Sequence, residues 1–443
     1  MTLTLEQLKA KVAGQKTALP AFYGSVDFDA TPERFNDDPI DPTATDKASA
    51  ARARILADPE KVERMRAYSM LGDTVADAYA ALIPQHGFRG LIDMLTRACD
   101  QGLDAVPEAP PELVAFIHAM EQTPAWLDMA LVEEGARLDR NNIVNVSPFT
   151  MRAGFIATFM NKYAALPMAL TGTLSNETSA KRVKETATFF ATTALPGALE
   201  RHGPGFRAAA MVRLMHSMVR FNALRSKGWD KAVFGIPIPQ IDQMPAGLAP
   251  IFFMAYALLA KGRIAYTPQQ RAKVELARYR CFLLGLPEEL LPDTPQGIVE
   301  IMNLRDQTLR KGFDDKTCGE LLRATLDAYL PADESLGGRM FNRIEKGFSK
   351  MLFVRVILGG DEVEARSVGV TLNTADRLFF LGSTIFVGLR RKAYDLAADV
   401  PGLREAADRT LVRKIHRLLA QYGHAEFTSD AAAYRANHLP QAA

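Results

Sequence analysis

The sequence predicts an all-α protein, and three observations support this prediction. Apolar residues recur at the helical spacing i, i+3, i+4 and i+7 from about residue 47 to residue 330. Alanine and leucine are plentiful over that range, and prolines or glycines separate the periodic segments. No alternating strand pattern flanked by hairpin dipeptides persists there. We therefore expect a succession of helices.

The first segment, residues 1–60, is predicted to hold a short amphipathic helix followed by an irregular arm. The arm, residues 18–46, is rich in proline and aspartate and shows no helical period, so we expect it to be solvated. Residues 61–330 are predicted to form the helical core. Its main irregular interruption is the segment 227–247, where three prolines rule out a continuous helix.

The last segment, residues 331–443, is predicted to be a helical extension packed on the core, with two or three helices after Gly338. An apolar stripe at helical spacing marks one of them, and it consists of Leu378, Leu381, Ile385 and Leu389. A second amphipathic helix ends at a glycine, residue 423. The segment 354–360 fits either a short strand or the end of a helix.

Composition and charge narrow the class of protein. The chain has 443 residues, of which 48% are hydrophobic and 23% charged, as in soluble globular proteins. A net charge of only +2 offers no global field to attract nucleic acid. The three scattered cysteines suit a reducing compartment, and we find neither an export signal nor a membrane span. We expect a cytoplasmic protein without a transmembrane segment, and peripheral membrane contact stays open.

Most familiar catalytic motifs are absent. The segment "GPGFRA" (203–208) matches a dinucleotide fingerprint in letters, but no strand precedes it and no βαβ unit surrounds it. The chain contains no phosphate-binding loop, no zinc-protease motif and no nucleophile elbow. The chemistry must therefore be sought in less regular patterns.

One histidine stands among methionines and valines in "MVRLMHSMVR" (211–220). His216 lies on an apolar face, and Arg213 and Arg220, at −3 and +4, flank it on the same side of the helix. A buried imidazole needs a hydrogen-bond partner, so one interpretation is a core histidine satisfied by a backbone carbonyl. The other is a haem ligand, with the two arginines as partners of the propionates.

The preceding predicted helix carries a polar cluster. Arg182, Glu185 and Thr186 share one face of the segment 179–197 with two phenylalanines. One interpretation is a surface ion pair between Arg182 and Glu185, worth a few tenths of a kcal/mol by the rule for such pairs. The alternative is a functional site that places a cation, an acid and a hydroxyl within one helical turn.

Taken together, these motifs resemble a known family. "RVKETATFF", followed 216 − 186 = 30 residues after Thr186 by the histidine of "VRLMHSMVR", is similar to the haem oxygenases of the latex-clearing (rubber-cleaving) type. That family also includes the ER-bound oxygenase domain of mycophenolic acid biosynthesis. The stretch 228–292, which closes with "RYRCFLLGLPEELLP", supports the resemblance. The similarity runs over roughly residues 50–295.

The resemblance implies a globin-like helical core that binds haem b, with extra N- and C-terminal helices. His216 would be the proximal iron ligand, and Arg182 and Thr186 match an arginine and a threonine near the haem. It also implies an oxygenase that uses O₂ as co-substrate on an apolar, isoprenoid- or lipid-like substrate. Oxidative cleavage of a carbon–carbon double bond is the expected reaction. Arg213 and Arg220 as cofactor-binding residues follow from helical geometry and not from the family.

The chain differs from the rubber-cleaving members in the positions of its acidic residues. Those enzymes use a glutamate on the helix before the arginine, whereas residues 150–176 of this chain contain no aspartate or glutamate. They carry a lysine before the threonine, where this chain has Glu185, which is our candidate for a substitute catalytic base. We therefore expect a small apolar metabolite as substrate and not polymeric rubber.

Two alternatives to a haem oxygenase stay open. The missing glutamate favours a non-catalytic haem- or lipid-binding helical protein. The third interpretation is a cofactor-free bundle in which His216 is an ordinary core residue. The oligomeric state is not indicated by the sequence.

Overall fold

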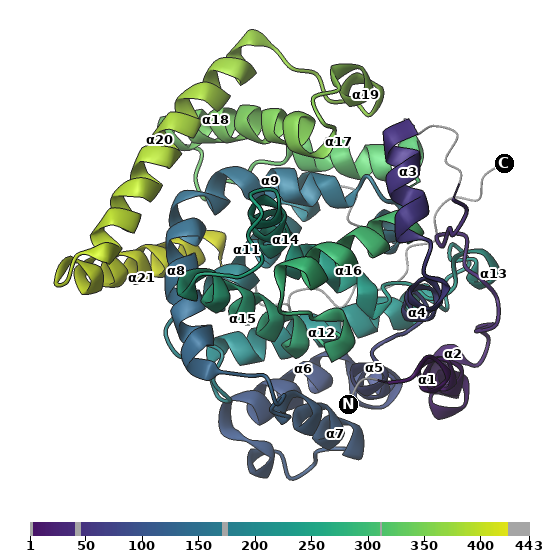
Figure 1. Ribbon diagram of the computed structural model, residues 1–443. Helices are drawn as coiled ribbons and strands as arrows, with labels where there is room; N and C mark the ends of the chain where they lie inside the picture. The colour runs from purple at the N-terminus through teal and green to yellow at the C-terminus, as the bar shows by residue number, and fades with distance from the viewer. Residues whose placement is uncertain (1–2, 40–45, 171–175, 311, 424–443) are drawn as a thin grey trace. The chain divides into compact units, whose positions relative to one another are not determined.

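The computed structural model describes residues 3–39, 46–170, 176–310 and 312–423. Within these ranges every regular element is a helix (Figure 1), and one isolated bridge pairs Phe35 with Leu309. The predicted all-α fold class is confirmed. None of the helices in the described ranges is long and apolar enough to cross a membrane.

The described chain divides into two compact units that interleave along the sequence. Among the described residues, unit 1 comprises those up to 135 and those from 209 to 312, and unit 2 comprises those from 136 to 208 and from 313 to 423. The sequence predicted three consecutive segments with boundaries at residues 60 and 330. That division remains a prediction.

Unit 1 contains the predicted His216 helix and most of the N-terminal half of the chain. Its helices are α1 (Leu5–Ala18), α2 (Pro20–Tyr23), α3 (Asp46–Ile55), α4 (Pro59–Tyr68), α5 (Thr74–Ala80), α6 (Ile83–Gln101), α7 (Pro111–Glu121), the start of α8 (Met129–Asn145), most of α12 (Pro204–Ala223), α13 (Lys231–Phe234), α14 (Met244–Leu259), α15 (Pro268–Leu283) and α16 (Pro295–Thr308). Short 3-10 turns lie at Leu103–Ala105, Gln240–Gln243 and Glu288–Leu290.

The N-terminal arm is only partly as predicted. Its irregular backbone is confirmed between α2 and residue 39, but the expected solvation is wrong. Val26 and Phe35 are buried, and the guanidinium of the buried Arg34 pairs with Asp242. Apolar side chains spaced too irregularly to predict a helix therefore still contribute to the core. In the segment 227–247 the predicted break occurs, and α14 begins within it.

Unit 2 holds the Arg182 helix and the C-terminal helices. Its elements are the rest of α8, α9 (Ser147–Thr158), α10 (Lys162–Leu170), α11 (Asn176–Thr192), a π-turn η4 (Asp315–Gly319), α17 (Glu320–Asp327), α18 (Leu336–Leu352), a π-turn η5 (Phe353–Ile357), α19 (Glu362–Ser367), α20 (Thr374–Asp399) and α21 (Leu403–Tyr422). The segment 354–360 is thus a helix end and not a strand. Its last two residues, Gly359 and Gly360, have positive φ and follow the end of η5 at Ile357.

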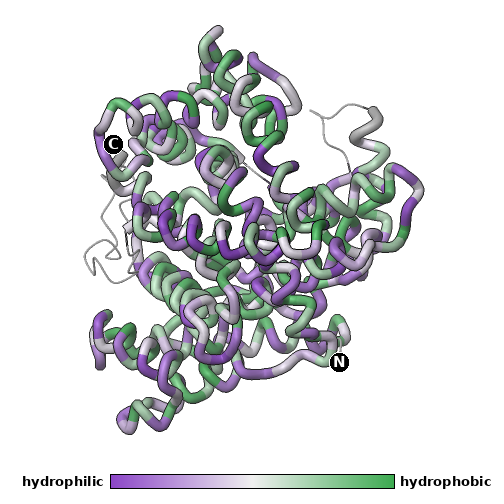
Figure 2. The backbone as a smooth tube through the Cα atoms, turned by 90° about the vertical axis from the view of Figure 1, so that its left-hand side faces the viewer, coloured by the Kyte–Doolittle hydropathy of each residue, from purple (hydrophilic) through white to green (hydrophobic). Residues whose placement is uncertain are grey.

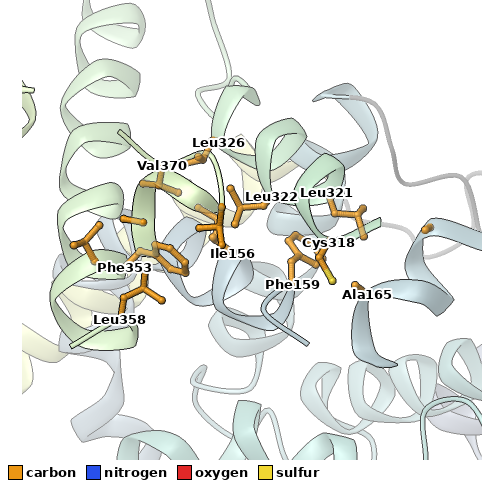
Figure 3. Close-up of a cluster of buried hydrophobic side chains, with 14 residues drawn as sticks. Ile156, Phe159, Ala165, Cys318, Leu321, Leu322, Leu326, Phe353, Leu358 and Val370 are labelled. Carbon is orange, nitrogen blue, oxygen red and sulfur yellow. The ribbon is translucent and has the colours of Figure 1, made fainter. Parts of the chain in front are cut away.

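The core of unit 2 brings α9, α10, α17 and the segment after α18 together. Figure 3 shows the side chains of Ile156 and Leu322 between Phe353 on one side and Phe159 with Cys318 on the other. Phe159 and Phe353 have no exposed surface. In Figure 2 hydrophobic and hydrophilic residues alternate along the helical tubes, the pattern expected when one face of each helix is buried.

A buried arginine ties three helices of unit 2 together. Arg152 of α9 is fully buried, and its Nε donates to Glu345 of α18 at 2.8 Å. Its Nη1 donates to three carbonyl oxygens at the C-terminal end of α17, those of Thr325, Leu326 and Ala328, at 2.6–3.0 Å. A helix C-terminus has unpaired carbonyl groups and partial negative charge, so a guanidinium satisfies both.

Candidate functional site

The residues predicted to form the site fall in different units. His216, Arg213 and Arg220 belong to unit 1, whereas Arg182, Glu185 and Thr186 belong to unit 2. The structure confirms that each set lies on one helix, α12 and α11 respectively.

His216 lies in the middle of α12 and is half-buried. The helix neighbours Met215, Met218 and Val219 are buried apolar side chains. The imidazole Nδ1 lies 2.8 Å from Nε2 of Gln243, which is 6% exposed and ends the 3-10 turn Gln240–Gln243. The predicted backbone-carbonyl partner is therefore replaced at this nitrogen by a side-chain amide.

The arginines that flank His216 have buried acidic partners, Asp73 at the N-cap of α5 and Asp77 within α5. Arg213 donates to both carboxylate oxygens of Asp73, with Nη2 3.0 Å from Oδ1. Arg220, 1% exposed, contacts Asp77 through Nη1. Its Nε donates to the carbonyl oxygen of Pro237 at 3.0 Å, and its Nη2 contacts that of Ile238. A propionate would have to share these arginines with aspartates, and the propionate contacts remain predictions.

The pKa values of the two aspartates are shifted in opposite directions. Burial raises the pKa of Asp77 to about 6, helped by the charge of Asp73 and opposed by Arg220. Burial acts in the same direction on Asp73, but the contacts from Arg213 outweigh it and lower the pKa of Asp73 below its usual range. The Tyr23 hydroxyl also contacts Asp77, and burial raises the pKa of Tyr23 well above its ordinary value.

On α11 the structure contains the ion pair that one interpretation predicted. Arg182 Nη1 lies 3.0 Å from Glu185 Oε2, and the side chains are 21% and 6% exposed. Glu185 is therefore more buried than a surface pair requires, while Thr186 is half-buried. One turn further on, the buried hydroxyl of Thr188 has no hydrogen-bond partner among the described residues.

The surroundings of His216 are compatible with a role for this histidine as a haem ligand. A haem iron needs one axial side chain from the protein. When that side chain is a histidine, its second ring nitrogen is held by a hydrogen bond. The described ranges contain no group of three or more histidine, cysteine, aspartate or glutamate side chains that could hold a metal ion. With the Gln243 amide turned by a half-rotation, Oε1 would accept from Nδ1–H, which is the tautomer that a metal bound at Nε2 would require.

Comparison with known proteins finds a family model that matches part of the chain. Residues 145–348 match the model of the catalytic domain of ER-bound oxygenase mpaB/B′ and rubber oxygenase. The predicted resemblance to this family is confirmed. The matched segment contains α11 and α12, and with them all six predicted site residues.

Two relatives of this family agree with the match. The chain is 23% identical over 259 residues to the rubber oxygenase of Streptomyces sp. (strain K30), and the alignment covers 57% of this chain. It spans only 60% of the length of that relative. A solved structure of latex clearing protein LCP in the closed state superposes with a TM-score of 0.55 at 20% identity, covering 79% of this chain and 91% of LCP. At that identity the structural match establishes the fold alone.

Sequence reasoning missed Gln243, Asp73 and Asp77. Gln243 is 27 residues from His216 and carries no motif of its own. The aspartates did leave a signal, because they stand four residues apart, at the N-cap of α5 and within it, and meet arginines seven residues apart on α12. Buried arginines in an apolar helix require such partners, so Arg220 was the residue in the sequence that indicated them.

Proposed function

We propose that this protein is a haem b-dependent oxygenase that uses O₂ on a small apolar, isoprenoid- or lipid-like substrate. Oxidative cleavage of a carbon–carbon double bond is the reaction we propose. The match of residues 145–348 to an oxygenase catalytic domain carries the proposal. The half-buried histidine among apolar side chains, with Gln243 at Nδ1, supports the cofactor.

In this proposal His216 holds the iron through Nε2, and the Gln243 amide keeps the ring in one tautomer and orientation. Haem, when bound, supplies the iron chemistry that activates O₂. The apolar side chains around His216 limit the access of water to the ring. Arg213 and Arg220 support the same helix through their buried aspartate partners.

Glu185 is our candidate for the base that takes a proton from the substrate. Its Oε2 accepts a hydrogen bond from Arg182 Nη1, which would position the carboxylate. Thr186 directly follows Glu185, and its hydroxyl can donate a hydrogen bond to an oxygen of the substrate or product. Unlike the glutamate of the rubber-cleaving members, this acid stands on the arginine's own helix.

Substitution of His216 tests the cofactor. The purified protein is expected to show a haem Soret band, and His216→Ala is expected to lose it or to shift it strongly, because the axial ligand is gone. The exposed His118 of α7, in the same unit, supplies a control, and His118→Ala should keep the wild-type spectrum. A wild-type chain that gains no Soret band even with added hemin would end the haem proposal.

Substitution of Gln243 tests how the ligand is held. Gln243→Leu is expected to weaken haem binding by about tenfold or more, since loss of such a partner typically costs 10–100-fold in metal affinity. The iron–histidine stretching frequency of the reduced protein should fall as well. Gln243→Glu keeps an acceptor and should restore that frequency or raise it. An unchanged spectrum in Gln243→Leu would show that another group holds the ring.

Product analysis separates the oxygenase from a haem-binding protein without activity. Incubation of the haem-loaded protein with unsaturated isoprenoids under O₂ is expected to give carbonyl products. A protein that binds haem through His216 but forms no product with any unsaturated lipid would favour the carrier or sensor alternative.

A further inference from the structure

The helix α20 exposes a long apolar stripe. Five large apolar side chains, at positions 378, 381, 385, 389 and 396, share one face of α20 and are 56–66% exposed. We call them the α20 stripe, and they are Leu378, Leu381, Ile385, Leu389 and Leu396. The sequence pattern predicted a helix here, and such a pattern usually marks the face that packs on a core.

The opposite face of α20 makes the packing contacts. Asp376, Ser383 and Val387 are buried, and α20 lies against α18 and α21 within unit 2 (Figure 1). Because α20 already has a buried face, the stripe opposite to it points outward. Soluble monomers rarely expose a contiguous apolar area of this kind, and where they do it marks an interaction surface.

The helices α20 and α21 together carry a net positive charge. Residues 374–423, which form α20 and α21, contain 9 arginines and lysines and 5 aspartates and glutamates, a net charge of 9 − 5 = +4. The whole chain carries only +2, so the remainder is net negative. Three consecutive cations, Arg390, Arg391 and Lys392, follow Leu389 directly, and Arg377 precedes Leu378. Arg377 and Arg391 also form exposed ion pairs, with Glu362 and Asp395.

We propose that the α20 stripe docks on an anionic lipid surface, with α20 lying in the plane of the interface. Apolar side chains on one face of a helix enter the boundary between headgroups and acyl chains, and flanking arginines and lysines bind anionic headgroups. The helix is not apolar enough to cross the membrane, which agrees with a surface position.

Charge favours a lipid surface over a second copy of the chain as the occupant. If two α20 helices paired antiparallel about Ile385, Arg377 of one would face residue 393 of the other, with Lys392 on one side of it and Asp395 on the other. Such a pair would gain no net attraction from these charges, whereas an anionic surface attracts the cluster Arg390, Arg391 and Lys392. The lipid proposal does not depend on the proposed oxygenase function.

Vesicle binding of the full-length chain tests the proposal. Phosphatidylcholine vesicles with and without about a third phosphatidylserine serve as the probe. The wild type is expected to sediment with the anionic vesicles and to dissociate as salt is raised. The triple variant Leu381→Ser/Ile385→Ser/Leu389→Ser should weaken vesicle binding by about tenfold or more. It removes three apolar side chains that would otherwise be buried in the lipid interface.

Two controls make the result specific. Phe253→Ser/Tyr256→Ser removes apolar side chains of α14 in unit 1 that are 56% and 59% exposed, and it should leave vesicle binding unchanged. Because all substituted side chains are exposed, circular dichroism should show wild-type helix content in both variants. Arg390→Gln/Arg391→Gln/Lys392→Gln should reduce the preference for phosphatidylserine.

Three results would overturn the proposal. One is a wild-type chain that ignores anionic vesicles, and another is binding that the triple serine variant leaves intact. The third is a lipid-free wild-type dimer that the same variant converts to a monomer, which would assign the stripe to a second copy. The Soret band of the His216 experiment is read separately, so failure of one proposal leaves the other standing.

Discussion

Replacing Arg152 with methionine is expected to lower the free energy of unfolding of unit 2 by about 3–5 kcal/mol, the cost typical of breaking a buried ion pair by removing one partner. Glu345, 1% exposed, would lose its cation and remain buried. The three carbonyl oxygens at the end of α17 would lose their donor as well. Both losses act on one site, so the effect should lie at the upper end of that range.

Denaturant unfolding followed by circular dichroism measures this effect. Arg366→Met, at an exposed position of α19 in the same unit, is the control and should change stability by less than about 0.5 kcal/mol. Arg152→Lys keeps the charge but not the planar fork that reaches Glu345 and the carbonyls together, and should lie between the two. A loss below 1 kcal/mol in Arg152→Met would mean that Glu345 finds another partner.

Arg220→Met is expected to destabilise unit 1 by a similar amount, about 3–5 kcal/mol near neutral pH. The variant leaves Asp77 fully buried without its cation. The pKa of Asp77 is already raised to about 6 by burial, and it should rise further when Arg220 is gone. Asp77 can then escape the penalty by taking up a proton.

The pH dependence follows from that proton. A carboxyl whose pKa is raised by folding contributes its full stability in acid, and this contribution is lost as pH rises through the folded-state pKa. The difference in unfolding free energy between the wild type and Arg220→Met should therefore be small near about pH 5 and grow above about pH 6.

A second substitution isolates the carboxyl. Adding Asp77→Asn to Arg220→Met removes the buried charge, so the double variant should recover part of the lost stability at neutral pH and show a flatter pH profile. Lys227→Met, exposed beyond the end of α12, serves as the surface control. A destabilisation by Arg220→Met that does not change with pH would show that lost packing, and not the charge of Asp77, is responsible.

The sequence by itself determined the features that depend on local spacing. Helical periodicity placed His216 on one helix and Arg182 with Glu185 on another, and the i, i+3 spacing anticipated their ion pair. The motifs around them were enough to indicate the family that residues 145–348 match. These features need only neighbouring residues, because the geometry of a helix is the same wherever it packs.

Tertiary structure alone decided which partners these helices meet. Gln243 contacts His216 from 27 residues away in the sequence, and Asp77 pairs with Arg220 although 143 residues separate them. A buried polar group requires a partner, but the sequence does not say where the chain will bring one. The same limit explains α20, where periodicity identified the shared apolar face but not its direction. Which face is buried is set by the other helices that compete for the core, and on α20 the face of Val387 is the buried one.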